Sequence, residues 1–126
     1  MPFTRVSMIK GKSAKYKQTV LECIYQALRT TFAVAEDDRF MVVQEHDLDD
    51  FAYHPTYLGL TRTDDTLVIE ITCNNTRSVD QKKALYRDIA DRLGKSLGFR
   101  PDDAVICIIE VAKENWSMGN GEASFA

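Results

Sequence analysis

An internal repeat with a period of 65 residues constrains the fold of this chain more than any local motif. When residues 2–46 are laid over residues 67–111 without a gap, seven positions are identical, against about three expected from average composition. The two units are therefore predicted to share one local structure and to be related by a pseudo-twofold axis. The identical pairs are Ser13/Ser78, Lys17/Lys82, Ile24/Ile89, Leu28/Leu93, Asp37/Asp102, Asp38/Asp103 and Glu45/Glu110.

The first unit, residues 2–46, follows a strand–helix–strand pattern. Residues 2–9 alternate loosely between apolar and polar and end at Lys10-Gly11, which indicates a strand followed by a turn. Ser13 is a suitable N-cap for a helix that runs to about Thr31, with apolar residues spaced along one face. The apolar stretch 40–43 then predicts a second strand, which completes a β-α-β unit.

The second unit, residues 67–111, repeats this pattern with stronger signals. Residues 67–72 are a nearly continuous apolar run and predict a strand. Ser78 with Gln81 three positions later predicts a capping box at the start of a second helix. Residues 105–109 predict the last strand.

These elements predict one domain spanning 1–126, an α+β fold with a duplicated β-α-β unit, a four-stranded mixed sheet and two helices on one face. The helices share a face because both crossovers should be right-handed. We expect the opposite face to be uncovered and apolar, which favours oligomerisation. The connector, 47–66, is expected to add a short strand or hairpin, and the C-terminal tail covers 112–126.

Composition excludes several functional classes. The net charge of −3 argues against a general nucleic-acid-binding protein, and no stretch approaches the ~20 apolar residues of a membrane span. Three widely spaced cysteines, Cys23, Cys73 and Cys107, indicate neither a disulfide framework nor a metal site, so we expect buried thiols and a cytoplasmic protein. His46 and His54 lack partners at metal-ligand spacing.

Differences between the two units indicate where chemistry should lie. Pro2 stands opposite Leu67, and removal of Met1 would leave Pro2 as a secondary amine. Burial disfavours the charged form of such an amine, so it can move protons or attack a carbonyl near neutral pH. A proline at the second position is also common without any function.

Two further differences lie in the second unit. Arg77 directly precedes the predicted cap of the second helix, where a carboxylate would be well held, although a plain surface arginine fits too. The tail offers Trp116, Met118 and Phe125, which could wall an apolar pocket or pack against a neighbouring subunit.

Together these motifs resemble the tautomerase superfamily, and most closely its malonate semialdehyde decarboxylase branch. The resemblance rests on the Met-Pro start, the duplicated β-α-β unit and the segment Asp38-Arg39-Phe40. It also rests on Thr-Arg-Ser-x-x-Gln-Lys at 76–82 and Trp-Ser-Met-Gly-x-Gly-Glu-Ala-Ser at 116–124. It spans essentially the whole chain.

The resemblance implies a homotrimer built on its sheets, with no metal and no organic cofactor. It implies that Pro2 is a catalytic base or acid, that Arg77 binds the substrate carboxylate, and that Asp38 activates water or orients the substrate. Trp116 and Phe125 match pocket positions. Asp38 also has a structural alternative, because the repeat places Asp103 at the same point.

Two departures from the decarboxylase pattern leave more than one type of reaction possible. Asn75 stands where that enzyme has a second arginine, and Met118 stands where it has an aromatic residue. A neutral Asn75 cannot replace the charge of an arginine. The sequence therefore favours a cofactor-independent tautomerase for a small 2-oxo acid. A decarboxylase or hydratase using Pro2, Asp38 and Arg77, or a non-catalytic trimeric ligand-binding protein, are the alternatives.

Overall fold

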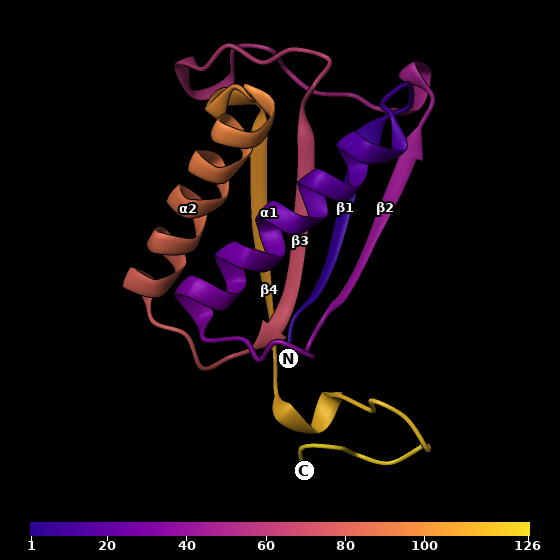
Figure 1. The fold of residues 1–126 in the computed structure, drawn as a ribbon, viewed down its shortest axis with the longest axis vertical. Coiled ribbons are helices and arrows are strands. Elements are labelled where there is room, and N and C mark those ends of the chain that lie inside the picture. Colours follow the sequence, from indigo (N-terminus) through magenta and orange to yellow (C-terminus); the bar gives the residue numbers. More distant parts are fainter.

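The computed structural model describes all 126 residues and has the predicted duplicated β-α-β architecture. The strands form one sheet in the order β2-β1-β3-β4, in which β1 and β3 are antiparallel and both outer pairs are parallel. Each helix connects the two parallel strands of its own unit, as Figure 1 shows. The elements are β1 (Phe3–Ile9), α1 (Ala14–Phe32), β2 (Phe40–His46), β3 (Leu67–Asn74), α2 (Val79–Leu97) and β4 (Ala104–Val111).

Both helices begin at the repeated serine, as the sequence predicts. The Ser13 side chain accepts a hydrogen bond of 3.0 Å from the backbone N–H of Tyr16. Ser78 accepts one of 3.1 Å from the backbone of Gln81, whose side chain accepts one of 2.9 Å from the Ser78 backbone. The predicted capping box is confirmed, and it satisfies two N–H groups that lack partners inside the helix.

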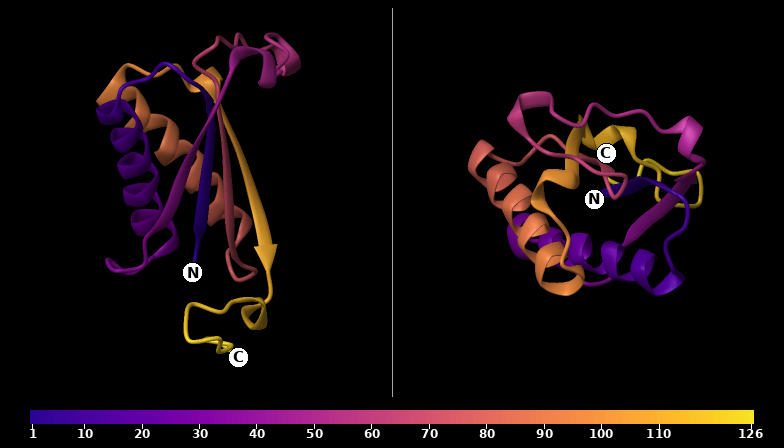
Figure 2. Two further views of the ribbon diagram at one scale, coloured as in Figure 1. Left: turned by 90° about the vertical axis from the view of Figure 1, so that its right-hand side faces the viewer. Right: turned by 90° about the horizontal axis from the view of Figure 1, so that it is seen from above.

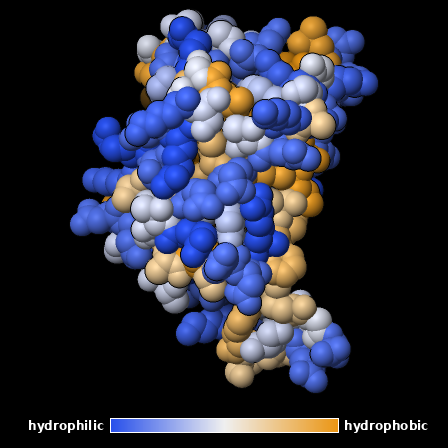
Figure 3. Space-filling view, in the orientation of Figure 1, coloured by the Kyte–Doolittle hydropathy of each residue, from blue (hydrophilic) through white to orange (hydrophobic).

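Both helices cover the same face of the sheet, and the core lies between these two layers (Figure 2). The outer side of the helices is mainly hydrophilic, as expected for a solvent-facing layer (Figure 3). Neither helix combines the length and the hydropathy needed to cross a membrane. The apolar core draws on both units and includes Val6, Met8, Val20, Ile24, Leu28, Ile69, Ile71, Leu85, Ile89 and Leu93.

The repeat extends to side-chain contacts. Lys17 lies 3.0 Å from Glu45 in the first unit, and Lys82 lies 2.8 Å from Glu110 in the second. Each pair joins a helix to the second strand of its unit, and the two pairs are 65 positions apart. The alignment of the two units is therefore structural and does not depend on sequence identity alone.

The open face of the sheet differs from the expectation. It is uncovered, but its centre is polar, because Arg5 on β1 lies opposite Glu70 on β3. Apolar residues gather toward the outer strands, where Phe40 is 47% exposed and Ile109 is 40% exposed. Cys107 also points to this face and is exposed, so the expectation of three buried cysteines is wrong at this position.

The connector adds no strand to the sheet. It forms two short 3-10 turns, Leu48–Asp50 and Tyr57–Gly59, so the expected strand or hairpin is wrong. Side-chain carboxylates from the second repeat unit bind the connector backbone groups that a strand would have needed. Asp102 accepts from the Thr61 N–H at 2.9 Å and Asp103 accepts from the Thr63 N–H at 2.7 Å.

Candidate functional site

The predicted site residues from four separate segments gather at one end of the sheet. At this end β1 and β2 begin and β3 and β4 finish, which follows from the strand directions. Pro2 directly precedes β1, Asp38 lies just before β2, Arg77 lies in the turn between β3 and α2, and Trp116 follows β4. Figure 1 shows the N-terminus and the tail at this same end.

Pro2 is buried, and Met1 covers it in this structure. The Met1 side chain is only 3% exposed, and its amine lies 3.8 Å from Asp38 Oδ2. None of the surface pockets is lined by Pro2, Asp38 or Arg77. With Met1 attached, the Pro2 nitrogen is an amide without a basic lone pair, so the chemistry expected of Pro2 requires removal of Met1.

Asp38 carries an incompletely satisfied carboxyl group. Its backbone N–H closes a turn by donating to the Ala35 carbonyl at 3.1 Å. Its side-chain Oδ1 is buried and has no hydrogen-bond partner. Burial raises the pKa of Asp38 above the ordinary aspartate value, and the N-terminal amine and Arg77 counteract part of that rise. A carboxyl group with a raised pKa keeps its proton up to a higher pH than a solvated aspartate does, so it can exchange a proton at mildly acidic pH.

Arg77 is held against the end of α1. Its Nη2 donates to the Phe32 carbonyl at 3.0 Å, and the guanidinium carbon lies 4.9 Å from the centre of the Phe32 ring. Phe32 is the last residue of α1, whose terminal carbonyls have no partner inside the helix. These contacts fix the guanidinium while leaving further N–H donors for a carboxylate, which arginine binds in a bidentate manner.

Cys73 belongs to this cluster although its sequence context indicates only a core residue. It is 1% exposed, and burial raises the pKa of its thiol, while the positive charges of Arg77 and the N-terminal amine oppose that rise. The pairing of Phe3 with Thr72 brings the end of β3 beside Pro2. The side-chain alternation along β3 could have placed Cys73 on the helix-facing side at the strand's end.

Asn74 holds the tail, whereas its neighbour Asn75 is the residue that the sequence places at the substrate-binding position. Asn74 Oδ1 accepts a hydrogen bond of 2.7 Å from the indole Nε1 of Trp116. Asn75 contributes its backbone N–H, which donates to the Val111 carbonyl at 3.1 Å and ties the ends of β3 and β4 together. Side chains alternate between the two faces of a strand, so the sequence could have shown that Asn74 lies on the face opposite to Cys73 at the end of β3.

Met118 and Phe125 belong to the tail that follows β4, and this tail extends beyond the sheet (Figure 1). Their exposed fractions are 36% and 43%. The tail closes on itself, because the Met118 N–H donates to Ser124 Oγ at 2.9 Å and the Ser124 N–H donates to the Trp116 carbonyl at 3.3 Å. A single chain therefore leaves both side chains largely open to solvent.

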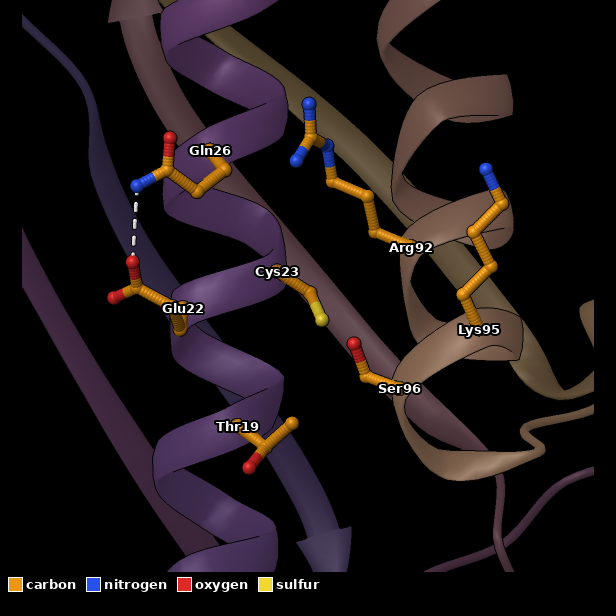
Figure 4. A pocket seen from close by; sticks show the side chains of 7 residues that line it. All are labelled: Thr19, Glu22, Cys23, Gln26, Arg92, Lys95 and Ser96. Atoms are coloured by element: carbon orange, nitrogen blue, oxygen red, sulfur yellow. Dashed lines mark hydrogen bonds between the residues drawn. The ribbon is translucent and has the colours of Figure 1, made fainter.

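A separate pocket of about 300 Å³ lies between α1 and α2, away from this cluster (Figure 4). The Cys23 thiol and the Ser96 hydroxyl point into the space between the two helices. Its lining is mostly polar, in contrast to the apolar walls typical of ligand sites. The lining residues are Thr19, Glu22, Cys23, Gln26, Arg92, Lys95 and Ser96.

Comparison with known sequences places this geometry in context. Residues 38–119 match a family model described as "Tautomerase enzyme". The chain is 38% identical over 123 residues to the probable tautomerase YusQ of Bacillus subtilis (strain 168), covering 98% of this chain and 97% of the relative. The probable tautomerase YrdN of the same organism is 30% identical over 125 residues, covering 99% and 96%.

Solved structures share the fold at lower identity. A crystal structure of malonate semialdehyde decarboxylase, described with decarboxylase and hydratase activities, superposes with a TM-score of 0.92 at 24% identity and covers 98% of this chain and 95% of that one. A fused 4-OT symmetric trimer superposes with a TM-score of 0.77 at 17% identity and covers 95% and 94%. These similarities support the architecture of the chain.

Proposed function

The chain belongs to the tautomerase superfamily, and on that premise we propose that it is a cofactor-independent enzyme that tautomerises a small 2-oxo acid. The observation that carries the proposal is that a buried Pro2 and the partly buried Asp38 and Arg77 lie at the same end of the sheet. Three separate segments supply these groups. A secondary amine, a carboxyl group and a guanidinium form a proton-transfer site with its own carboxylate anchor.

Pro2 is the proton carrier in this mechanism. Removal of Met1 exposes the secondary amine and vacates the space that the Met1 side chain fills. Burial and the positive charge of Arg77 favour the neutral amine, while the Asp38 carboxylate favours the charged form. The neutral amine removes the proton from the enol hydroxyl at C2, the C2–O bond becomes a carbonyl, and the proton is returned to C3.

Arg77 and Trp116 bind and enclose the substrate. The free donors of the Arg77 guanidinium hold the C1 carboxylate, with Phe32 fixing the plane of the group from behind. Trp116 is anchored by Asn74 at the same end of the sheet and excludes water from the reacting carbons. Met118 and Phe125 complete the apolar wall where the tail meets a neighbouring subunit.

Ketonisation of phenylenolpyruvate tests this proposal. We expect activity only in protein whose intact mass shows that Met1 is absent, and we expect Pro2→Ala to lower kcat about 100-fold. Arg77→Ala should mainly raise KM. Its matched control is Lys12→Ala, because Lys12 is the repeat counterpart of Arg77 and lies at the opposite end, paired with Asp65 at 2.5 Å. Equal rates for the wild type and Pro2→Ala would overturn the mechanism.

The buried, unpartnered Oδ1 of Asp38 favours a second candidate, decarboxylation of a 3-oxo acid. Here a protonated Pro2 donates to the carbonyl oxygen while the C–C bond to the carboxylate breaks, so that CO₂ and an enol leave. Asn75 supplies no second positive charge for this reaction. CO₂ release by the wild type that disappears in Asp38→Asn would favour this candidate over tautomerisation.

A homotrimer is the proposed assembly. The open face of the sheet supports it, because apolar side chains on β2 and β4 remain uncovered in one chain, among them Phe40 and Ile109. We expect light scattering to give three times the chain mass of 14.3 kDa. Ile109→Lys should shift the protein to monomers, whereas a monomeric wild type would overturn the proposed assembly.

A further inference from the structure

A second pocket lies at the end of the sheet opposite Pro2, and we infer that it is a non-catalytic binding site for a small apolar carboxylate. This pocket, of about 400 Å³, lies where the connector covers the beginning of β3 and β4, at the end of the sheet away from Phe40 and Ile109. Its size falls within the roughly 300–1,000 Å³ of small-molecule sites. The lining residues are Ala52, Tyr53, His54, Tyr57, Leu58, Arg62, Thr66, Val68 and Val105.

The sheet residues that line this pocket are the repeat counterparts of residues around the start of β1 and β2. A shift of 65 positions places Thr66, Val68 and Val105 on Met1, Phe3 and Phe40. Thr66 directly precedes β3 and Val68 is its second residue, as Met1 and Phe3 stand around the start of β1. The pseudo-twofold relation therefore gives both ends of the sheet the same backbone framework for a pocket.

The groups proposed for chemistry are absent or occupied at this second end. Leu67 stands at the position of Pro2 and offers no amine. Asp103, the counterpart of Asp38, accepts hydrogen bonds of 2.7 Å from both the N–H and the hydroxyl of Thr63. Lys12, the counterpart of Arg77, is paired with Asp65. The second pocket can therefore bind a ligand but lacks the groups for proton transfer.

Arg62 gives the pocket its preference for an anion. Its Nη1 donates to the Tyr57 carbonyl at 2.9 Å and to the His54 carbonyl at 3.5 Å, which fixes the side chain. Its Nε and Nη2 have no partner in the chain and can donate to a carboxylate. No acidic residue lines the pocket, and the nearby Asp64 already accepts a hydrogen bond of 2.7 Å from the Tyr53 hydroxyl.

His54 adds a second donor. Its Nδ1 accepts a hydrogen bond of 3.2 Å from the backbone N–H of Thr56, so the neutral ring carries its proton on Nε2. The walls around these two donors are apolar, with Val68 and Val105 from the sheet and Leu58 from the connector. A ligand with one carboxylate and a small aromatic or branched body satisfies both features of the pocket.

The local backbone holds the apolar rim open. Leu58 has a φ of 60°, a left-handed conformation that is unfavourable for a bulky side chain, and it is 77% exposed. Its neighbour Tyr57 is 65% exposed. Strained, exposed apolar residues around a cavity are typical of binding sites.

An NMR titration of the full chain with 3-phenylpropanoate tests the inference. The Arg77→Ala variant is used, so that binding at the Pro2 end is weakened and the two ends are distinguished. We expect saturable shifts of the Thr66, Val68 and Val105 amides, and about tenfold weaker binding of the neutral 3-phenylpropanamide, because only the acid forms a charge-assisted pair. Shifts confined to the Pro2 end, or no saturable shift, would overturn the inference.

Two variants made in the same Arg77→Ala background separate the role of Arg62 from the fold of the connector. Arg62→Met should weaken binding about tenfold because it removes the charged donor. Ala52→Phe narrows the pocket, leaves Arg62 in place and should weaken binding to a similar degree. Unchanged affinity in both variants contradicts a site at this position, whatever the outcome of the Pro2 experiments.

Discussion

Asp38 and Asp103 occupy the same position in the two repeat units but differ in their hydrogen bonding. Asp103 is 1% exposed and accepts bonds from Thr63 and from the Thr66 hydroxyl, the latter at 3.2 Å. Asp38 keeps one buried oxygen without a partner and lies 3.8 Å from the N-terminal amine. Asp103 therefore has a clear structural role, which Asp38 lacks at the same position of the repeat. This difference supports a functional role for Asp38.

This difference predicts that replacing the aspartate by asparagine affects stability differently at the two positions. Asp103→Asn should lower the free energy of unfolding by about 2 kcal/mol or more, because an amide cannot accept all the hydrogen bonds that the carboxylate receives. Asp38→Asn should change it by less than about 1 kcal/mol or raise it, because a buried charge is removed and the ion pair lost is a weak one. Urea unfolding of both variants measures the difference, and equal losses would contradict the assignment.

The raised pKa of Asp38 predicts a pH dependence of stability. A carboxyl group whose pKa is higher in the folded state than in the unfolded state binds more protons when folded. Its ionisation therefore costs stability as the pH rises from the ordinary aspartate value through the folded-state pKa. Asp38→Asn removes this cost, so the difference in unfolding free energy between variant and wild type should grow from pH 3 to pH 7. A constant difference would show that the pKa is not raised.

The two helix ends provide a matched test of backbone strain. Ala33 ends α1 with a φ of 53°, and Gly98 ends α2 with a φ of 63° at the equivalent position. Left-handed backbone is strained for alanine and not for glycine. Ala33→Gly should stabilise the protein by about 0.5–1 kcal/mol, and Gly98→Ala should destabilise it by about 1 kcal/mol. No atom lies within 4 Å of a Cβ added at Gly98, so conformation alone decides the sign.

The sequence predicted the architecture well because the same pattern occurs twice. Each unit supplies its own strands and its own N-capping serine, and both helices formed as predicted. The open face was harder to predict, because Arg5 and Glu70 each look like an ordinary surface charge until the register places them opposite each other. The connector was mispredicted for a similar reason, since its shape depends on carboxylates that lie about 40 residues later in the chain.

The site could be predicted in part. The contrast between the units pointed to Pro2, whose counterpart is Leu67, and the place of Arg77 directly before the cap of α2 pointed to that residue. Cys73 and Asn74 were missed, because their roles arise only where the end of β3 meets the N-terminus and the tail. Such contacts between distant segments are not encoded in any local spacing.

The repeated ion pairs should contribute little despite their regularity. Lys17–Glu45 and Lys82–Glu110 are both partly exposed, so water screens them. Lys17→Met and Lys82→Met should each leave the free energy of unfolding almost unchanged, and the two small effects should add because the sites are independent. Thermal unfolding in low and high salt checks this, since the loss should shrink at high salt.

The hydrogen bond from Trp116 to Asn74 should hold the tail against the end of the sheet. Trp116→Phe keeps an aromatic ring but removes the indole N–H, and Asn74→Ala removes the acceptor. Each change should cost about 1 kcal/mol, and the double variant should cost little more than either alone, because the two residues share one interaction. The tail amides after Trp116 should exchange with solvent faster in each single variant, while those of β1 remain protected. Additive costs with unchanged exchange would show that the tail is held by other contacts.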